Sequence, residues 1–345
     1  MNGFSTTAPS RCKRSFWSAR AARALMALSL PALSPPALCL IALSLMALSL
    51  MVLPGRAMAK TIQVGPGRLV TTPGQAALLV RDGDTVVFDP GTYTGCAIWR
   101  ASRLTIEAPR PGAVVTGPVC LDRALFVFLG NDIMIRGLSF EHARALGHTG
   151  AGILMEGANL LVEDSRFIDN ENGILAGGPP HSIVRVRHSW FQSNGSCEGP
   201  CAHGLYIGTK IARLEVVGCV FLDTKIGHHI KSKAAATILW DNRIEDGRTG
   251  TASYLVDLPN GGDTEIMNNI FHKGARSDNK EAAISIGAEG GWQSTHVLRI
   301  RGNRFSSDLP EPVRFVRNGM NVPAVLKGNM LHGHVIALDG PGTVE

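Results

Sequence analysis

The sequence has 345 residues, of which 45% are hydrophobic, 18% are charged and 6% are aromatic, and this composition excludes a disordered chain and a collagen-like polymer. The formal net charge is +6, but residues 1–59 hold six basic residues and no acidic ones, so the other 28 basic and 28 acidic residues balance. The folded part therefore lacks the basic charge typical of nucleic-acid binding, and we exclude that class of function.

The first 59 residues have the pattern of an export signal. A basic stretch precedes the apolar run from Ala37 to Leu53, and Ala57-Met58-Ala59 follows as the small-x-small pattern of a signal-peptidase site. We expect residues 1–59 to be a signal peptide and residues 60–345 to form one periplasmic or secreted domain, without membrane contact after cleavage. The alternative is an uncleaved anchor, because the apolar run is near the shortest that spans a bilayer.

An alternating apolar strand that ends in a hydrophobic anchor recurs between residues 133 and 331. The anchors are Phe140, Phe167, Phe191, Phe221, Ile244, Phe271, Phe305 and Leu331. Two positions before the last four anchors stand Asn242, Asn269, Asn303 and Asn329. Identical amides can hydrogen-bond to one another on parallel strands about 4.8 Å apart, so we expect an inward asparagine ladder.

A second short strand follows the anchors, as in Gly152–Glu156, Gly204–Gly208 and Tyr254–Asp257. Each repeat thus contributes at least two strands, and residues 120–335 show no helical period of useful length. The sequence predicts an all-β protein, a parallel β-solenoid in which each coil stacks on the last. Residues 82–93 and 103–107 are expected as its opening coils, and residues 73–80 as a short N-terminal helix that caps its open end.

Five cysteines follow the leader. Cys197 and Cys201 flank a tight turn and are expected to form a disulfide, although His203 nearby leaves a zinc site as the alternative. Cys96 and Cys120 lie about one coil apart, which suits a disulfide between stacked coils. Cys219 occupies the inward ladder position and is expected as a buried free thiol.

Residues 83–93 read GDTVVFDPGTY, and the later coils repeat the pattern apolar-x-Val-x-x-Asn-x-Phe. These features resemble the right-handed parallel β-helix, or pectin-lyase-like, superfamily over residues 60–340. Segments 203–208, 227–233, 250–262 and 286–290 resemble a group of exported bacterial β-helix repeat proteins. The superfamily consists mostly of polysaccharide lyases, uronan epimerases and glycoside hydrolases, so the resemblance implies action on a polysaccharide. The chain lacks the Arg-x-Pro-x-x-Arg signature of pectate lyases, and it lacks the Asp-Asp and Gly-His-Gly motifs of polygalacturonases.

Stacked strands place titratable groups on one face of the middle coils. Aligning the second strands puts Tyr206 and His229 in one outward column, Lys231 and Asp257 in the next, and Lys233 with Glu289 beyond them. Clustered cations repel one another unless an anion lies between them, which favours an acidic substrate. The alternative for Lys231 and Asp257 is a simple cross-strand ion pair, and an inward His228 is expected to be an ordinary core histidine.

For a uronate polymer the expected chemistry is β-elimination. A cation neutralises the C6 carboxylate, a base removes the C5 proton and an acid protonates the leaving O4. The expected base is His229 or Lys231, with Asp257 tuning its pKa, and the expected acid is Tyr206 or His203. A C5-epimerase would use the same groups and reprotonate the other face.

Lys233 is expected to hold the substrate carboxylate, with Asn260 and Glu289 as further substrate contacts. This chemistry needs no cofactor, and assistance by calcium stays open, as does the oligomeric state. One alternative is an inverting glycoside hydrolase that pairs Asp257 with Glu289 or Asp263. The other is a non-catalytic protein that binds polysaccharide or builds an envelope structure.

Overall fold

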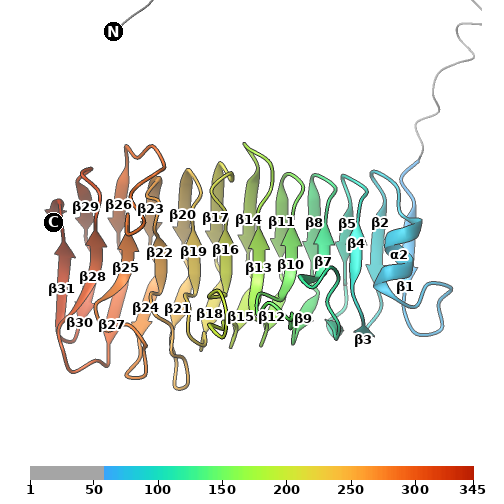
Figure 1. The fold of residues 1–345 in the computed structure, drawn as a ribbon, viewed down its shortest axis with the longest axis horizontal. Coiled ribbons are helices and arrows are strands. Elements are labelled where there is room, and N and C mark those ends of the chain that lie inside the picture. The colour runs from blue at the N-terminus through green and yellow to red at the C-terminus, as the bar shows by residue number, and fades with distance from the viewer. Residues whose placement is uncertain (1–57) are drawn as a thin grey trace, which may run out of the picture. The chain divides into compact units, whose positions relative to one another are not determined.

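Each coil of the chain adds one strand to each of three parallel sheets in the computed structural model, which describes residues 58–345 (Figure 1). The three sheets, here called A, B and C, have 12, 10 and 10 strands. The fold is a right-handed parallel β-helix, as the sequence predicts, and the third strand per coil goes beyond the two that the repeats revealed. The expected signal peptide lies outside the described residues except for Met58 and Ala59.

The strands follow one another along the chain in the order A, B, C. Sheet A contains β1 (Thr61–Val64), β2 (Thr85–Phe88), β5 (Thr105–Glu107), β8 (Ile133–Arg136), β11 (Leu160–Glu163), β14 (Ile183–Arg187), β17 (Arg213–Val217), β20 (Ala236–Trp240), β23 (Asp263–Met267), β26 (Leu298–Arg301), β29 (Ala324–Lys327) and β32 (Gly342–Val344). Sheet B contains β3 (Gly91–Thr94), β6 (Ala113–Thr116), β9 (Ser139–Glu141), β12 (Arg166–Ile168), β15 (Trp190–Gln192), β18 (Val220–Leu222), β21 (Arg243–Glu245), β24 (Ile270–Lys273), β27 (Arg304–Ser307) and β30 (Met330–His332). Sheet C contains β4 (Ala97–Trp99), β7 (Ala124–Phe128), β10 (Ala151–Met155), β13 (Asn172–Ala176), β16 (Leu205–Ile207), β19 (Ile230–Ser232), β22 (Val256–Leu258), β25 (Ala282–Ile286), β28 (Val313–Asn318) and β31 (Val335–Asp339).

A single short helix, α2 (Pro73–Leu79), packs against β4 and β1 at the N-terminal end of the described residues (Figure 1). Thr72 begins it as a capping residue whose hydroxyl accepts a bond from the Gln75 backbone, and the Gln75 side chain bonds back to the Thr72 backbone. This capping box and the proline at the first helical position are standard helix-start signals. The predicted capping helix is thus confirmed.

The anchor residues of the repeat lie in sheet B and pair with one another in register. Phe140, Phe167, Phe191 and Phe221 stack with centroid separations of 5.3, 4.7 and 4.4 Å. All four rings are fully buried. Their burial gives each coil a hydrophobic contact with the next, which fixes the repeat as the unit of the core.

The asparagine ladder runs through the interior beside these anchors. The Oδ1 atoms of Asn269, Asn303 and Asn329 each accept bonds from the backbone N–H and the side-chain amide of the preceding asparagine, at 2.9–3.0 Å. Cys219 continues the ladder, since its N–H donates to Asn242 Oδ1. Burial raises the pKa of the Cys219 thiol to about 12, and the residue is a free cysteine.

Two disulfides join the cysteine pairs that the sequence suggests. Cys96 and Cys120, with Cα atoms 5.5 Å apart, connect neighbouring coils before β4 and β7. Cys197 and Cys201 close a small loop before β16. Because the sulfurs of Cys197 and Cys201 are bonded to each other, they cannot bind zinc together with His203, and that alternative is wrong.

Removing the Cys96–Cys120 bond should cost about 3 kcal/mol of unfolding free energy, because the bond closes a 24-residue loop in the unfolded chain. The double variant Cys96→Ser/Cys120→Ser tests this by chemical denaturation. The matched control is Cys197→Ser/Cys201→Ser, whose separation of 4 residues predicts a smaller loss of about 2 kcal/mol. Equal losses in the two variants would contradict the loop-length argument.

Candidate functional site

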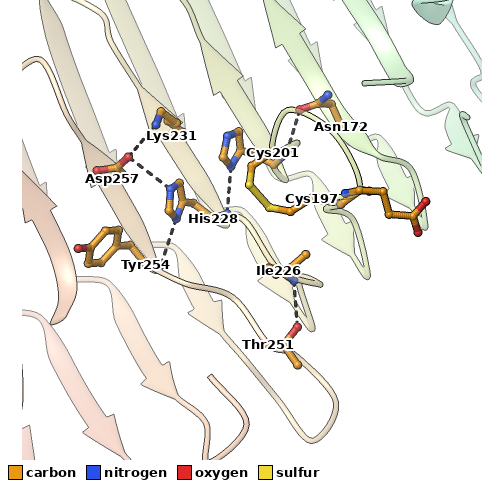
Figure 2. The surroundings of a disulfide bond; sticks show 12 residues. Asn172, Cys197, Cys201, Ile226, His228, Lys231, Thr251, Tyr254 and Asp257 are labelled. Atoms are coloured by element: carbon orange, nitrogen blue, oxygen red, sulfur yellow. Dashed lines mark hydrogen bonds and ion pairs between the residues drawn. A yellow bond between two sulfur atoms is a disulfide. The ribbon is translucent and has the colours of Figure 1, made fainter. Parts of the chain in front are cut away.

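A column of polar side chains runs across the outward face of sheet C. The strand register places Tyr206 beside Lys231, Lys231 beside Asp257, and Asp257 beside Ser285. Lys231 Nζ lies 3.1 Å from Asp257 Oδ2 (Figure 2). Tyr206 and Lys231 are partly exposed, whereas Asp257 is buried. The predicted adjacency of Lys231 and Asp257 holds, but Tyr206 belongs to their column and not to that of His229.

A second column lies at the bend that precedes sheet C. The backbone N–H of His203 donates to Asn172 Oδ1, that of His228 to His203 Nδ1, and that of Tyr254 to His228 Nδ1, at 2.8, 3.0 and 3.1 Å. The two imidazoles stack with centroids 4.8 Å apart, and the Tyr254 ring lies 5.4 Å from that of His228. His228 Nε2 is 3.4 Å from Asp257 Oδ2, which joins this column to the first (Figure 2).

These bonds fix the protonation of both imidazoles. Each Nδ1 accepts a backbone N–H, so in the neutral ring the proton sits on Nε2. Burial, together with the charge of Lys231, lowers the pKa of His228 to about 3. Burial, His228 and the two lysines also hold the pKa of His203 well below its ordinary value. Both rings are therefore neutral Nε2–H donors at neutral pH.

His228 should make the protein less stable as the pH falls from 6.5 towards 3, because only the unfolded chain takes up its proton in that window. The variant His228→Asn keeps a side-chain acceptor for Tyr254 and does not titrate. We expect the variant to lose about 2 kcal/mol less unfolding free energy than the wild type between pH 7 and pH 5, measured by denaturation. Identical pH dependence in the two proteins would show that His228 titrates normally when folded.

One carboxylate binds both lysines of this face. Glu289 Oε1 is 2.9 Å from Lys231 Nζ, and Glu289 Oε2 is 2.5 Å from Lys233 Nζ. Burial opposes the charge of Lys231, but Asp257 and Glu289 outweigh it, so the pKa of Lys231 is raised. Burial likewise opposes the charge of Glu289, yet hydrogen bonds from the two lysines lower its pKa. Lys231 is therefore a cation at neutral pH.

Two buried oxygens near the column have no hydrogen-bond partner, Asp257 Oδ1 and Asn260 Oδ1. Burial raises the pKa of Asp257 against the opposing charge of Lys231. Only 3% of Asp257 and 4% of Asn260 is exposed. The predicted substrate contact Asn260 therefore lies beneath the surface of the site.

The expected outward position of His229 is wrong. Its side chain is fully buried, where Nε2 lies 3.0 Å from Asp246 Oδ1 and Nδ1 lies 2.7 Å from Thr224 Oγ1. The chain bends before β19, so His229 and Ile230 both face the interior and the alternation of strand positions starts only at Ile230. His228, expected as a core residue if inward, is the histidine that borders the outer face.

The interior around His229 is an ordered polar network. Asp246 also accepts bonds from Ser277 Oγ and the Gly274 backbone, and hydrogen bonds from His229 and Ser277 lower its pKa despite burial. Lys273 donates to Ser253 O at 2.5 Å, and burial lowers its pKa to about 8. His229, Asp246 and Lys273 are fully buried, and the network ties the bend between sheets B and C together.

The remaining expected carboxylate, Asp263, lies elsewhere. It begins β23 in sheet A, where its Oδ1 accepts bonds from the backbone N–H groups of His296 and Val297. It therefore takes no part in the sheet C column. Within residues 58–345 no group of three or more His, Cys, Asp and Glu side chains is arranged to hold a metal ion, and no helix could span a membrane.

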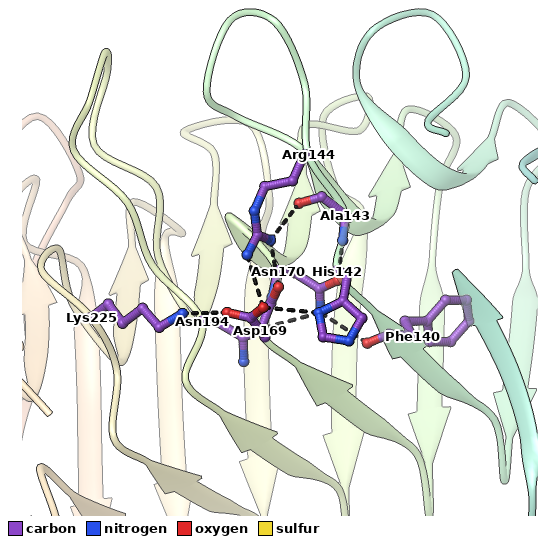
Figure 3. A network of polar contacts seen from close by, with 8 residues as sticks. All are labelled: Phe140, His142, Ala143, Arg144, Asp169, Asn170, Asn194 and Lys225. Carbon is purple, nitrogen blue, oxygen red and sulfur yellow. Dashed lines mark hydrogen bonds and ion pairs between the residues drawn. The ribbon is translucent and has the colours of Figure 1, made fainter. Parts of the chain in front are cut away.

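A separate cluster surrounds Asp169, beyond the end of β12 (Figure 3). His142 Nδ1 and Arg144 Nη2 lie 2.8 and 2.9 Å from Asp169 Oδ2, and Lys225 pairs with the other oxygen. Burial opposes the charge of Asp169, but Lys225, His142 and Arg144 together lower its pKa. Both carboxylate oxygens of Asp169 pair with side chains from other coils, so we assign this cluster a structural role.

Three residues around the site were not predicted from the sequence: Tyr254, Trp292 and Gln293. They contact His228, the Glu289 carbonyl and the Lys233 carbonyl, respectively. Tyr254 had a detectable signal, because it stands two positions before the inward Val256, as His203 and His228 stand before Leu205 and Ile230. Trp292 and Gln293 belong to a loop outside the repeat, so periodicity carries no information about them.

No protein-family model matches the chain, and no curated protein matches it. Among solved structures, the pectate lyase Pel9A is 14% identical with a TM-score of 0.49, and the match covers 82% of this chain and 80% of that one. A Geobacillus virus E2 protein, ORF18, is 14% identical with a TM-score of 0.49, over 88% of this chain and 63% of that one. A family PL6 alginate lyase is 17% identical with a TM-score of 0.45, over 84% of this chain and 40% of that one. Likeness at this level concerns the fold alone.

Proposed function

We propose that this β-helix is exported and acts on an acidic, uronate-containing polysaccharide at the outward face of sheet C, as a lyase or C5-epimerase. The observation that carries the proposal is the pair Lys231 and Lys233, which face outward beside the partly exposed Tyr206 and already bind a carboxylate. Residues 60–345 form the mature domain in this proposal, located in the periplasm or outside the cell.

The lysines act as the cation of the reaction. Lys231 keeps its charge because Asp257 and Glu289 raise its pKa, so it is poorly suited to remove a proton. Together with Lys233 it neutralises the C6 carboxylate of the substrate and stabilises the negative charge that develops when the C5 proton leaves. Asp257 is buried beneath Lys231 and holds it in place.

Since the lysines neutralise the substrate carboxylate, Tyr206 is the residue that transfers the proton. It lies next to Lys231 on the neighbouring strand, and in this proposal its phenolate is the base. The phenolate takes the C5 proton, the C4–O4 bond breaks as the C4–C5 double bond forms, and the proton passes to the leaving O4. The Nε2–H group of His228, whose side chain is 12% exposed, is a neutral donor for the departing oxygen, whereas His203 is only 3% exposed and positions His228 through its Nδ1. In an epimerase the C5 carbanion is instead protonated from the opposite face.

Non-catalytic binding of the same polymer is the second candidate. It is favoured because other titratable groups at the site already have partners within the protein. The imidazole Nδ1 atoms accept hydrogen bonds from backbone N–H groups, and both lysines pair with Glu289. An inverting hydrolase fits less well. Its two carboxyl groups stand roughly 6.5–9.5 Å apart with water between them, whereas Asp257 and Glu289 oxygens both lie within 3.1 Å of Lys231 Nζ.

The experiment is incubation of the purified protein with a panel of acidic polysaccharides. Ultraviolet absorbance reports an unsaturated lyase product, proton NMR at C5 reports epimerisation, and a reducing-end assay reports hydrolysis. Unsaturated product or inverted C5 supports the proposal. Reducing ends without unsaturation select the hydrolase, binding without any reaction selects the binding protein, and neither binding nor reaction rejects the assignment to acidic polysaccharides.

A further inference from the structure

The loop between β25 and β26 carries two unlike groups, Glu289 and Trp292, of which Glu289 contacts the lysines. Glu289 bridges Lys231 and Lys233, although 43% of its side chain is exposed. Lys231 and Lys233 are only 14% and 18% exposed, so the ammonium groups lie at the bottom of the site and the carboxylate lies above them. A carboxylate held by two ammonium groups is the arrangement that a uronate would adopt there.

The same loop carries Trp292, a residue that is 81% exposed. Its Nε1–H donates to Glu289 O at 2.8 Å, which fixes the indole next to the glutamate. Gly290 has a φ of +98°, a conformation that favours glycine, so the tight turn under the indole depends on that residue. An exposed indole held by a hydrogen bond offers an apolar face on which a ligand can pack.

The base of the loop is firmly attached to the β-helix. Gln293 Nε2 donates to Thr209 O and Lys233 O at 2.8 and 2.9 Å, and its backbone N–H donates to Asn260 O at 2.9 Å. The Glu289 backbone N–H donates to Pro259 O at 2.8 Å. The backbone therefore stays in place while the exposed Glu289 side chain is free to rotate away from the lysines.

We propose that Lys231, Lys233 and Trp292 form a subsite for one uronate residue, and that Glu289 occupies the position of its carboxylate while the subsite is empty. This inference rests on the proposed function and assigns the loop a part in it. The uronate carboxylate displaces Glu289 from the two ammonium groups, and the apolar C–H face of the pyranose ring packs on the indole. Glu289 thus competes with the substrate and selects ligands that carry a carboxylate.

Binding of oligogalacturonate and oligoalginate, measured by isothermal titration calorimetry, tests the inference. The variant Glu289→Gln removes the competing charge and should bind the better of the two ligands roughly threefold to tenfold more tightly, the range expected for losing partly exposed ion pairs. The matched control Glu265→Gln makes the same charge change on sheet A, where Glu265 pairs with Arg299, and should leave affinity unchanged. Trp292→Ala should weaken binding roughly threefold to tenfold, whereas Trp240→Ala on sheet A should not.

Each outcome decides a different point. Tighter binding by Glu289→Gln alone and weaker binding by Trp292→Ala alone support the subsite. If the wild type binds and neither variant differs from its control, the subsite is wrong while the proposed function stands. If Glu265→Gln and Glu289→Gln tighten binding equally, the effect is one of overall charge and Glu289 is no competitor. If no protein of the set binds either ligand, the subsite and the proposed function fail together.

Discussion

Replacing Lys231 with methionine should lower turnover of a uronate polymer by at least about a hundredfold, the usual contribution of a positioned catalytic group. Among residues 58–345, its ammonium is the cation in contact with both buried Asp257 and the carboxylate position held by Glu289. Its loss leaves the charge that develops at C5 without stabilisation, so the reduction should appear in kcat. Lys233→Ala should instead raise KM more than it lowers kcat, because Lys233 binds a carboxylate present in ground and transition states alike.

The Lys231→Met variant needs a control for folding, because removing Lys231 leaves the buried Asp257 carboxylate with only His228 beside it. Such an uncompensated charge commonly costs about 3–5 kcal/mol. The double variant Lys231→Met/Asp257→Asn removes both charges and should recover the melting temperature without recovering turnover. Lys210→Ala changes one exposed lysine outside the contacts of Glu289 and should keep wild-type activity. Full activity in the double variant would remove Lys231 from the mechanism.

Replacing Asn269 with aspartate should lower the unfolding free energy by several kcal/mol, since it places a charge in the asparagine ladder. Asn269 Nδ2 donates to Leu239 O at 3.0 Å and to Asn303 Oδ1 at 3.0 Å. A carboxylate oxygen cannot donate either bond and would face two acceptors instead. Because Asn269 is fully buried, water cannot replace the lost partners.

The adjacent residue provides the matched control. Asn268 is exposed at the turn before β24, so Asn268→Asp makes the same chemical change outside the ladder and should have a small effect. Denaturation curves of both variants at neutral pH measure the difference. Equal stability of Asn269→Asp and the wild type would mean that the ladder contributes nothing to the fold.

The repeat made the scaffold predictable from the sequence. Hydrophobic anchors and inward asparagines act on the next coil at the same strand position, so their spacing alone gave the correct register in sheets A and B. The strands of sheets A and B were merged into one strand that ends at the anchor, because only two residues separate them in most coils, as between β8 and β9. Sheet C was recognised as the second strand, but its strands follow a bend at which two consecutive residues face inward. Periodicity of two fails at such a bend.

The same bend explains the error at the candidate site. In the earlier coils the first inward residue is Gly173 or Gly204, where an added Cβ would lie only 2.4–2.5 Å from the backbone of the next coil. His229 is the counterpart of these glycines, and aligning it with Tyr206 shifted the coil by two residues. The predicted alignment displaced the coils of Lys231 and Asp257 by the same amount, so these two residues stayed adjacent. It placed His229 on the outer face and His228 inside, which is the reverse of the structure.

A crystal structure of the protein soaked with a uronate oligosaccharide tests the central claim most directly. We predict that one carboxylate of the ligand lies between Lys231 Nζ and Lys233 Nζ over β19, with Tyr206 beside the same sugar and Glu289 turned away. An oligosaccharide bound on sheet A, in the groove of about 500 Å³ lined by Arg187, Arg213 and Trp240, with Glu289 still on both lysines, would contradict the assignment of the site to sheet C.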